Sequence, residues 1–164
     1  MYSGKSTMLL SRYRRYKLGN KKCILIKYAN DNRYSESKVI THDNIGYDAI
    51  ACEKLEEIDS NINKYDVICI DEIQFYSDAA FYCDKWANNG KIVEVCGLNG
   101  DYRRKPFEQI SMLIPLVDSI IHLTAIDEEN GMNAPFTKRI TKEKTQYVIG
   151  GKEMYKASHR STFN

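Results

Sequence analysis

Met1-Tyr2-Ser3-Gly4-Lys5-Ser6-Thr7 opens the chain, and a helical pattern follows it directly. Gly-Lys-Ser-Thr is the second half of a phosphate-binding loop of the form G-x-x-x-x-G-K-[ST], which joins a strand to a helix. In such a loop the backbone N–H groups hold phosphate oxygens, the lysine neutralises the β- and γ-phosphates, and the hydroxyl ligates Mg²⁺. The stretch predicts a nucleotide-binding α/β fold with Lys5 at the phosphates and Ser6 at Mg²⁺.

A pair of acidic residues follows a second diagnostic stretch, the apolar and β-branched run at residues 65–70. This run is typical of a buried strand, and it ends in Asp71 and Glu72. A carboxylate at the carboxyl end of a parallel strand lies beside the phosphate loop and can hold Mg²⁺, while its neighbour can serve as a base. The alternative is a solvated acidic pair that caps the next helix. The Gly-Lys-Ser-Thr upstream favours the nucleotide site.

The remaining pattern alternates between helix and strand. We expect helices at residues 6–18, 50–58, 77–89 and 106–116, strands at 22–28, 65–70, 91–97, 118–124 and 145–149, a loop at 29–42 and turns at 127–133. Alternating elements predict an α/β fold of the P-loop type: a parallel sheet with helices on both faces. We divide the chain into a nucleotide-binding domain at 1–125 and a small irregular appendage at 126–164 that closes on the substrate.

Composition indicates a modest soluble enzyme of 164 residues with a net charge of only +2. We therefore expect no nucleic-acid partner, and no membrane partner, since no apolar run reaches the roughly 18–20 residues that span a bilayer. Five cysteines without C-x-x-C spacing indicate reduced thiols and a cytoplasmic location. Cys69 and Cys96 lie within predicted strands, where small core residues are expected.

Ordered sequence blocks along essentially the whole chain resemble the thymidine kinases of the cellular cytosolic and poxvirus type. The blocks are Met1-Tyr2-Ser3-Gly4-Lys5-Ser6-Thr7, residues 26–34 with Thr41-His42-Asp43, Asp71-Glu72-Ile73-Gln74-Phe75, Leu98-Asn99-Gly100-Asp101-Tyr102, Arg104-Lys105-Pro106-Phe107, Leu123-Thr124-Ala125, Phe136-Thr137-Lys138-Arg139, and Val148-Ile149-Gly150-Gly151 with Tyr155.

The resemblance implies ATP-dependent, Mg²⁺-assisted transfer of a phosphoryl group to the 5′-hydroxyl of thymidine, giving dTMP for DNA precursor synthesis. It implies that Glu72 is the general base and that Ser6 and Asp71 serve Mg²⁺. The implied ATP and phosphate contacts are Met1, Tyr2, Ser3, Gly4, Lys5, Ser6, Thr7, Asp31, Arg33, Asp71 and Gln74. A homotetramer and feedback by dTTP are also implied.

The implied nucleoside site has two parts. An apolar lining for thymine consists of Phe75, Leu98, Tyr102 and Phe107. A loop that closes over the nucleoside, mainly through main-chain hydrogen bonds, consists of Gln146, Tyr147, Val148, Ile149 and Gly150, with Tyr155. Aromatic faces and edges suit a planar base. From the residues alone, Phe75 and Phe107 can equally be ordinary core, and Arg33 can be a solvated charge.

Three departures from the family pattern limit these expectations. The family's opening strand and the Gly-Pro that begins its phosphate loop have no counterpart before Met1, so we expect a truncated record, because a sheet without that strand exposes unpaired edges. Tyr76 and Tyr102 stand where the family usually has phenylalanine. The four cysteines that bind zinc in the family are replaced by Asp127, Asn130, His159 and Thr162.

Asparagine and threonine are poor zinc ligands, so we expect no structural zinc. Two rival functions stay open at this point. One is a deoxynucleoside kinase of broader specificity on the same fold. The other is a nucleotide-binding protein with impaired catalysis, for which the missing glycine and the lost cysteines argue. The presence of both Lys5 and Glu72 argues against it.

Overall fold

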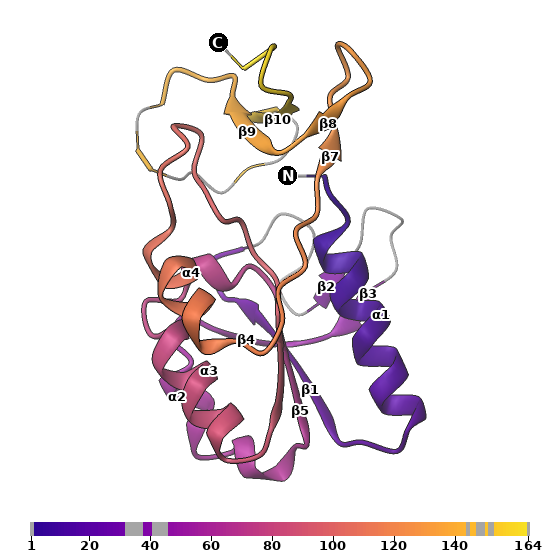
Figure 1. Cartoon of the computed structure of the whole chain (residues 1–164). Coiled ribbons are helices and arrows are strands. Elements are labelled where there is room, and N and C mark those ends of the chain that lie inside the picture. Colours follow the sequence, from indigo (N-terminus) through magenta and orange to yellow (C-terminus); the bar gives the residue numbers. More distant parts are fainter. Residues whose placement is uncertain are drawn as a thin grey trace.

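A parallel sheet of four strands forms the centre of the computed structural model, which describes residues 2–31, 38–40, 46–143, 145–146, 150 and 153–163 (Figure 1). The strand order is β4-β1-β5-β6. The strands are β1 (Cys23–Tyr28), β4 (Ile50–Cys52), β5 (Val67–Ile70) and β6 (Ile92–Val95). Every pairing between them is parallel, which confirms the α/β fold.

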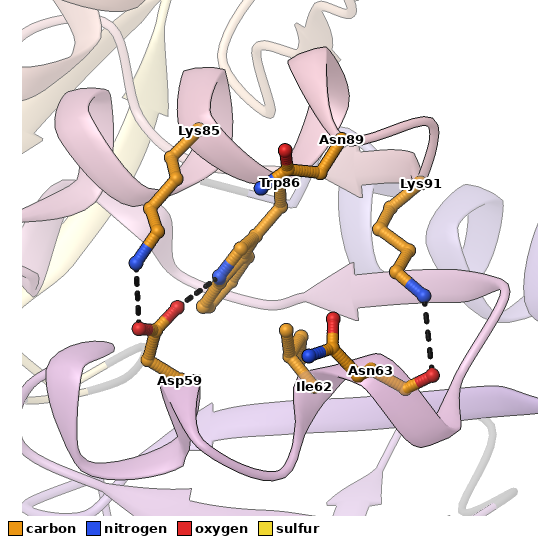
Figure 2. Close-up of a pocket in the computed structure, with 7 residues that line it drawn as sticks. All are labelled: Asp59, Ile62, Asn63, Lys85, Trp86, Asn89 and Lys91. Atoms are coloured by element: carbon orange, nitrogen blue, oxygen red, sulfur yellow. Dashed lines mark hydrogen bonds and ion pairs between the residues drawn. The ribbon is translucent and has the colours of Figure 1, made fainter.

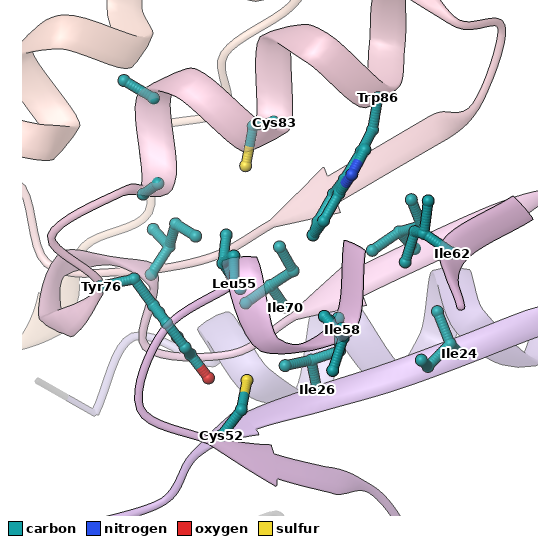
Figure 3. Close-up of a cluster of buried hydrophobic side chains, with 14 of the residues drawn as sticks. Ile24, Ile26, Cys52, Leu55, Ile58, Ile62, Ile70, Tyr76, Cys83 and Trp86 are labelled. Carbon is teal, nitrogen blue, oxygen red and sulfur yellow. The ribbon is translucent and has the colours of Figure 1, made fainter. Parts of the chain in front are cut away.

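Side chains of β1 and β5 alternate between two cores, one on each face of the sheet. Ile24, Ile26, Ile68 and Ile70 belong to the larger core, together with α2 (Glu56–Asp59) and α3 (Ala79–Asn88) (Figure 3). Leu25, Val67 and Cys69 point to the other face and pack against α1 (Lys5–Leu18). Because successive strand residues face opposite sides, near-continuous apolar strands require helices on both faces, as predicted.

Several predicted elements are confirmed with shifted ends. The helix at 6–18, the strands at 22–28, 65–70 and 91–97, and the helix at 77–89 correspond to α1, β1, β5, β6 and α3. The predicted helix at 106–116 begins later, as α4 (Glu108–Leu113), and continues as the 3₁₀ helix η3 (Ile114–Leu116). Two further 3₁₀ helices are η1 (Ile62–Lys64) and η2 (Ile73–Phe75).

The predicted helix at 50–58 is wrong in its first half. Residues Ile50–Cys52 form β4, which pairs with β1 in the register Ile26↔Ile50, and only Glu56–Asp59 are helical. Pairing with a neighbouring strand outweighs local helix propensity at this sheet edge. The predicted loop at 29–42 contains β2 (Lys38–Ile40), which pairs with β3 (Gly46–Asp48).

The predicted strand at 118–124 is also wrong. These residues have no regular structure, and the side chains of Ile120 and Ile121 are 62% and 53% exposed. β-branched composition favours a strand only where a partner strand supplies hydrogen bonds. Of the predicted strand at 145–149, Thr145 and Gln146 lie in a bend, and Tyr147–Ile149 lie outside the described residues.

Two small antiparallel sheets form the C-terminal part of the chain (Figure 1). β7 (Ala125–Ile126) pairs with β8 (Asn133–Ala134), and β9 (Phe136–Arg139) pairs with β10 (Tyr155–Ser158). The turn between β7 and β8 is as predicted and includes Gly131 at φ 70°. Among the described residues, no helix has both the length and the apolar character needed to cross a membrane.

Candidate active site

The phosphate loop leads into the N-terminus of α1. Gly4 has a left-handed backbone (φ 76°), which glycine adopts without strain, and its carbonyl accepts the first helical hydrogen bond from Met8 N at 2.9 Å. Lys5 and Ser6 form the first turn and are partly buried, while Thr7 is exposed. Tyr2 packs against alanines of the C-terminal sheets, and Met1 lies outside the described residues. The N–H groups of a first helical turn have no partner within the helix, and such groups can bind an anion.

A direct hydrogen bond joins the two predicted halves of the nucleotide site. The Ser6 hydroxyl donates to Asp71 Oδ1 at 3.0 Å, although the two residues are far apart in the sequence. Burial raises the pKa of Asp71, and the negative charge of Glu72 raises it further. Hydroxyl and carboxylate oxygens are the ligands that Mg²⁺ prefers, and Mg²⁺ usually completes its shell with phosphates and water. The pair therefore fits the metal that ATP brings.

Sequence reasoning missed the part that Cys96 has in this site. Its thiol donates a hydrogen bond to Asp71 Oδ1 at 2.8 Å. Burial and the Asp71 charge raise the pKa of Cys96, so the sulfur stays protonated and acts as a donor. The signal was available: Cys96 directly follows β6, the strand next to β5, and the carboxyl ends of parallel strands meet at one edge of the sheet.

Glu72 lies beside this carboxylate in a conformation that is uncommon for a residue with a side chain. Its backbone is left-handed (φ 52°, ψ 46°), and such strain is concentrated at functional sites. The buried Gln74 donates from Nε2 to Glu72 Oε2 at 2.6 Å, and its Oε1 accepts from Leu98 N at 3.1 Å. Gln74, expected at the phosphates from the resemblance, thus contacts the Glu72 carboxylate.

Gly97 allows this approach of Gln74. A Cβ added at Gly97 would lie 2.5 Å from Gln74 Oε1 and 2.9 Å from a methyl group of Ile73, closer than real atoms pack. The backbone between β6 and Leu98 must therefore pass without a side chain at this point. Glycine at position 97 thus lets the Gln74 amide oxygen come within hydrogen-bond distance of Leu98 N.

The residues expected around thymine lie at the end of η2 and on the segment between β6 and α4. Phe75 is partly buried, with its ring 5.3 Å from that of Tyr28. Phe107 is buried and Leu98 and Tyr102 are partly buried. Leu98, Tyr102 and Phe107 lie on one segment, which the buried Asp101 shapes. Asp101 Oδ1 accepts from the backbone N–H groups of Arg103 and Lys105 at 2.8 and 2.9 Å.

The remaining expected site residues are only partly described. Asp31 lies at the end of the β1 loop, where its carbonyl accepts from the buried Lys27 Nζ at 2.7 Å. Gln146 is exposed, and Gly150 and Tyr155 are buried. The Tyr155 hydroxyl accepts from Arg139 Nη2 at 2.6 Å. Arg33 and residues 147–149 lie outside the described residues.

Comparison with known proteins gives the family. A family profile described as thymidine kinase matches residues 1–163. The chain belongs to the thymidine kinase family. It is 42% identical over 163 residues to the thymidine kinase of vaccinia virus (strain Western Reserve) and 44% identical to that of raccoon poxvirus. Each alignment covers 99% of this chain and 92% of the relative. Membership makes the protein a kinase, and hence a transferase that uses ATP with a divalent metal.

In this thymidine kinase family member, hydrogen bonds join Asp127, His159 and Thr162, three of the four positions where the sequence resemblance places the family's zinc-binding cysteines. Asp127 is 2% exposed, and its Oδ2 accepts from the Thr162 hydroxyl and, at 2.6 Å, from His159 N. Its Oδ1 accepts from Glu129 N at 2.8 Å. These bonds lower the pKa of Asp127 to about 2. The carboxylate thereby ties the turn after β7 to the C-terminal segment.

A small cavity of about 100 Å³ lies away from this site, between η1 and the end of α3 (Figure 2). Four of the side chains that line it have hydrogen-bond partners within the protein: Asp59, Lys85, Trp86 and Lys91. Asp59 accepts from Lys85 Nζ at 2.6 Å and from Trp86 Nε1 at 2.8 Å, and Lys91 Nζ donates to Tyr65 O at 2.7 Å. These bonds connect α2 with α3, and neither the phosphate loop nor the acidic pair lines the cavity, so it is not a candidate active site.

Proposed function

We propose that this protein is an ATP-dependent thymidine kinase that phosphorylates the 5′-hydroxyl of thymidine to give dTMP. The observation that carries the proposal is the hydrogen bond between Ser6 and Asp71, with Glu72 next in the chain. It joins the phosphate loop to an acidic pair at the end of β5, which is the arrangement that phosphoryl transfer requires. Membership of the thymidine kinase family supports the choice of substrate.

The phosphate loop and its neighbours hold the triphosphate in this proposal. The backbone of residues 1–7 and the start of α1 bind phosphate oxygens, and Lys5 neutralises the β- and γ-phosphates. Asp31 and Arg33 contribute from the loop after β1. Ser6 and Asp71 hold Mg²⁺, which supplies charge neutralisation at the transferring phosphoryl group. Positioning and charge account for most of the catalysis, because phosphoryl transfer needs little covalent chemistry from the protein.

Glu72 is the proposed general base. Its carboxylate takes the proton of the 5′-hydroxyl as the hydroxyl oxygen bonds to the γ-phosphorus, and the bond from that phosphorus to the β–γ bridging oxygen breaks to release ADP. Gln74 orients the carboxylate by donating to Oε2 at 2.6 Å. Because the same amide accepts from Leu98 N, it links the base to the proposed thymine lining.

The nucleoside site is proposed to form between two parts of the chain. Phe75, Leu98, Tyr102 and Phe107 contribute apolar and aromatic surface for thymine. The segment at residues 146–150, with Tyr155, closes over the nucleoside through main-chain hydrogen bonds. In this proposal residues 1–125 bind ATP and residues 126–164 complete the thymidine site.

Assembly, regulation and location are further parts of the proposal. We propose a homotetramer, because apolar side chains on α3, α4 and the segment after it are exposed: Phe81 by 66%, Met112 by 49%, Ile114 by 54% and Ile120 by 62%. The end product dTTP is the proposed feedback ligand. Five free thiols support a reducing, cytoplasmic location.

The test is a product analysis with the purified protein, Mg²⁺, ATP and a panel of deoxynucleosides. The proposal predicts that thymidine and ATP are converted to dTMP and ADP in equal amounts, with thymidine preferred over deoxycytidine and the purine deoxynucleosides. Equal turnover of the whole panel would instead identify a broader deoxynucleoside kinase. Binding of ATP without any nucleoside product would identify a nucleotide-binding protein and overturn the proposal.

A further inference from the structure

The C-terminal strand β9 ends in a buried arginine that the proposed reaction does not use. Along β9 the exposed fractions alternate, so that Thr137 and Arg139 face inward, and Arg139 is only 8% exposed. A buried guanidinium remains charged, and removing it from water is expensive unless other groups surround it. The groups that surround Arg139 therefore indicate what it does.

Main-chain carbonyls of the segment that follows β9 receive its hydrogen bonds. Nη1 donates to Glu143 O at 2.9 Å and to Thr145 O at 2.6 Å, and Nη2 lies 3.5 Å from Gln146 O. One planar guanidinium thus contacts three carbonyls within four residues of chain. The segment has no strand pairing at Thr145 and Gln146, so these bonds are a main determinant of its course.

Two tyrosines flank the same guanidinium. Its central carbon lies 4.0 Å from the ring centroid of Tyr102 and 5.1 Å from that of Tyr155, and Nη2 donates to the Tyr155 hydroxyl at 2.6 Å. These are cation–π contacts within a desolvated site. In the described part of the chain, Arg139 forms no ion pair with a carboxylate. Its charge is stabilised by main-chain carbonyls and aromatic rings. These groups surround it only when the loop of Tyr102, the strand of Tyr155 and residues 143–146 are in contact.

We infer that Arg139 is a positioning residue that assembles the nucleoside site from its two halves. Tyr102 belongs to the loop proposed to line thymine, whereas Gln146 and Tyr155 belong to the part proposed to close over it. Arg139 contacts all three and fixes the distance between them. The inference rests on the proposed function only for the identity of the nucleoside, since the contacts themselves do not depend on it.

Arginine is required here, and lysine is not equivalent. The guanidinium presents two nitrogens in a fixed plane to separate acceptors while its faces stack on rings, whereas an ammonium is a compact charge at the end of a flexible stem. Arg139→Lys keeps the charge and most of the volume but loses the simultaneous contacts. Arg139→Ala leaves a space that free guanidinium ion can enter.

The first measurement is steady-state kinetics of Arg139→Lys and Arg139→Ala in the full chain, with Lys142→Ala as the matched control. Lys142 is an exposed cation on the same part of the chain. We expect the KM for thymidine to rise about 10- to 100-fold in both Arg139 variants, as for one or two lost charge-assisted hydrogen bonds, with the KM for ATP within about twofold of the parent. Added guanidinium lowers the thymidine KM of Arg139→Ala. Parallel increases in both KM values, or no rescue, would overturn the inference.

The second measurement, hydrogen exchange without any ligand, is independent of the substrate. Arg139→Lys is expected to speed exchange of the amides of residues 143–146 and 155, while the amides of β1 and β5 keep their protection. Lys142→Ala is expected to change neither. Unchanged exchange at residues 143–146 would refute the positioning role even if thymidine is the substrate. If Arg139→Lys speeds exchange at residues 143–146 but the parent protein forms no dTMP, the positioning role is supported and the proposed function is refuted.

Discussion

At the scale of single residues, the site depends on side chains that hold Asp71 and Glu72. Oδ1 of Asp71 accepts from Ser6, from Cys96 and, at 3.1 Å, from Glu72 N. The Glu72 carboxylate accepts from Gln74. Two adjacent carboxylates therefore have defined and different partners. The Asp71 carboxylate is directed toward the phosphate loop, and the Glu72 carboxylate contacts the Gln74 amide.

The contact between Gln74 and Glu72 gives a prediction with an internal control. Gln74→Met keeps the size of the side chain and removes the hydrogen bond to a charged oxygen. We expect turnover to fall about 10- to 100-fold, the effect of losing a bond of about 1.5–3 kcal/mol, with ATP binding unchanged. Gln109→Met is the control, because the Gln109 amide accepts from Ala80 N at 3.0 Å, on the helical side of the fold. Similar losses of turnover in both variants would show that stability, and not orientation of Glu72, is responsible.

At the scale of elements, the sequence predicted strands and helices best where apolar periodicity and tertiary partners agree. β1 and β5 are apolar on both faces and lie in the middle of the sheet, so their pattern and their environment coincide. The segments at 50–52 and 118–124 were misjudged for opposite reasons. Residues 50–52 pair with β1, although their own sequence does not predict a strand. Residues 118–124 have the composition of a strand but no partner strand.

The same limit applies to the candidate site. The motifs predicted that Ser6 and Asp71 meet, because each motif has a fixed place at the carboxyl edge of a parallel sheet. The contacts of Gln74, Cys96 and Arg139 were not predicted. Each depends on a group from another part of the chain: Leu98 N for Gln74, the Asp71 carboxylate for Cys96, and the carbonyls after β9 for Arg139. The place of Cys96 at the end of a strand next to β5 was a usable signal, but spacing in one sequence does not encode the contacts of Gln74 and Arg139.

The tie between β7 and the C-terminal segment predicts how the appendage responds to acid and to substitution. The pKa of Asp127 is lowered to about 2 from 3.8, so its contribution to stability is present above pH 3.8 and is lost as the pH falls toward 2. Asp127→Ala should speed proteolysis within residues 127–163 at neutral pH and leave β1 and β5 resistant. Glu128→Ala, an exposed neighbour of equal charge, should do neither.

The zinc expectation is tested on the same protein. We predict that elemental analysis after chelator treatment finds no zinc. At the positions where the resemblance places cysteines, the Asp127 carboxylate accepts from the Thr162 hydroxyl and from His159 N, and no thiolate is present. One zinc ion per chain that survives the chelator would contradict this prediction. Equal proteolysis of Asp127→Ala and Glu128→Ala would contradict the structural role of Asp127.

At the scale of the whole molecule, the proposed homotetramer is expected to use exposed apolar side chains on α3, α4 and the segment after them. Phe81, Met112, Ile114 and Ile120 extend from α3 to the segment after η3. Trp86, on the same helix as Phe81, is 1% exposed and belongs to the core, so only part of α3 is available for contact. In the proposed assembly these side chains form a contact between subunits, as large exposed apolar patches usually do.

Light scattering measures the assembly directly. With a chain mass of 19.0 kDa, the proposed homotetramer predicts a particle about four times as heavy at micromolar concentration. Phe81→Ser should lower that mass, because it places a polar group within the proposed contact, while the core keeps its packing. A monomer of the parent protein at the same concentration would refute the homotetramer.

The most direct test of the central claim, that Glu72 is the base of a thymidine kinase, is the turnover of Glu72→Gln in the full-length protein. Glutamine keeps the shape of the side chain but cannot take the 5′-hydroxyl proton. We predict that thymidine and ATP still bind nearly as in the parent and that turnover falls about 10²–10⁴-fold, the usual contribution of general-base catalysis. Turnover of Glu72→Gln within about threefold of the parent, well below that range, would contradict the assignment.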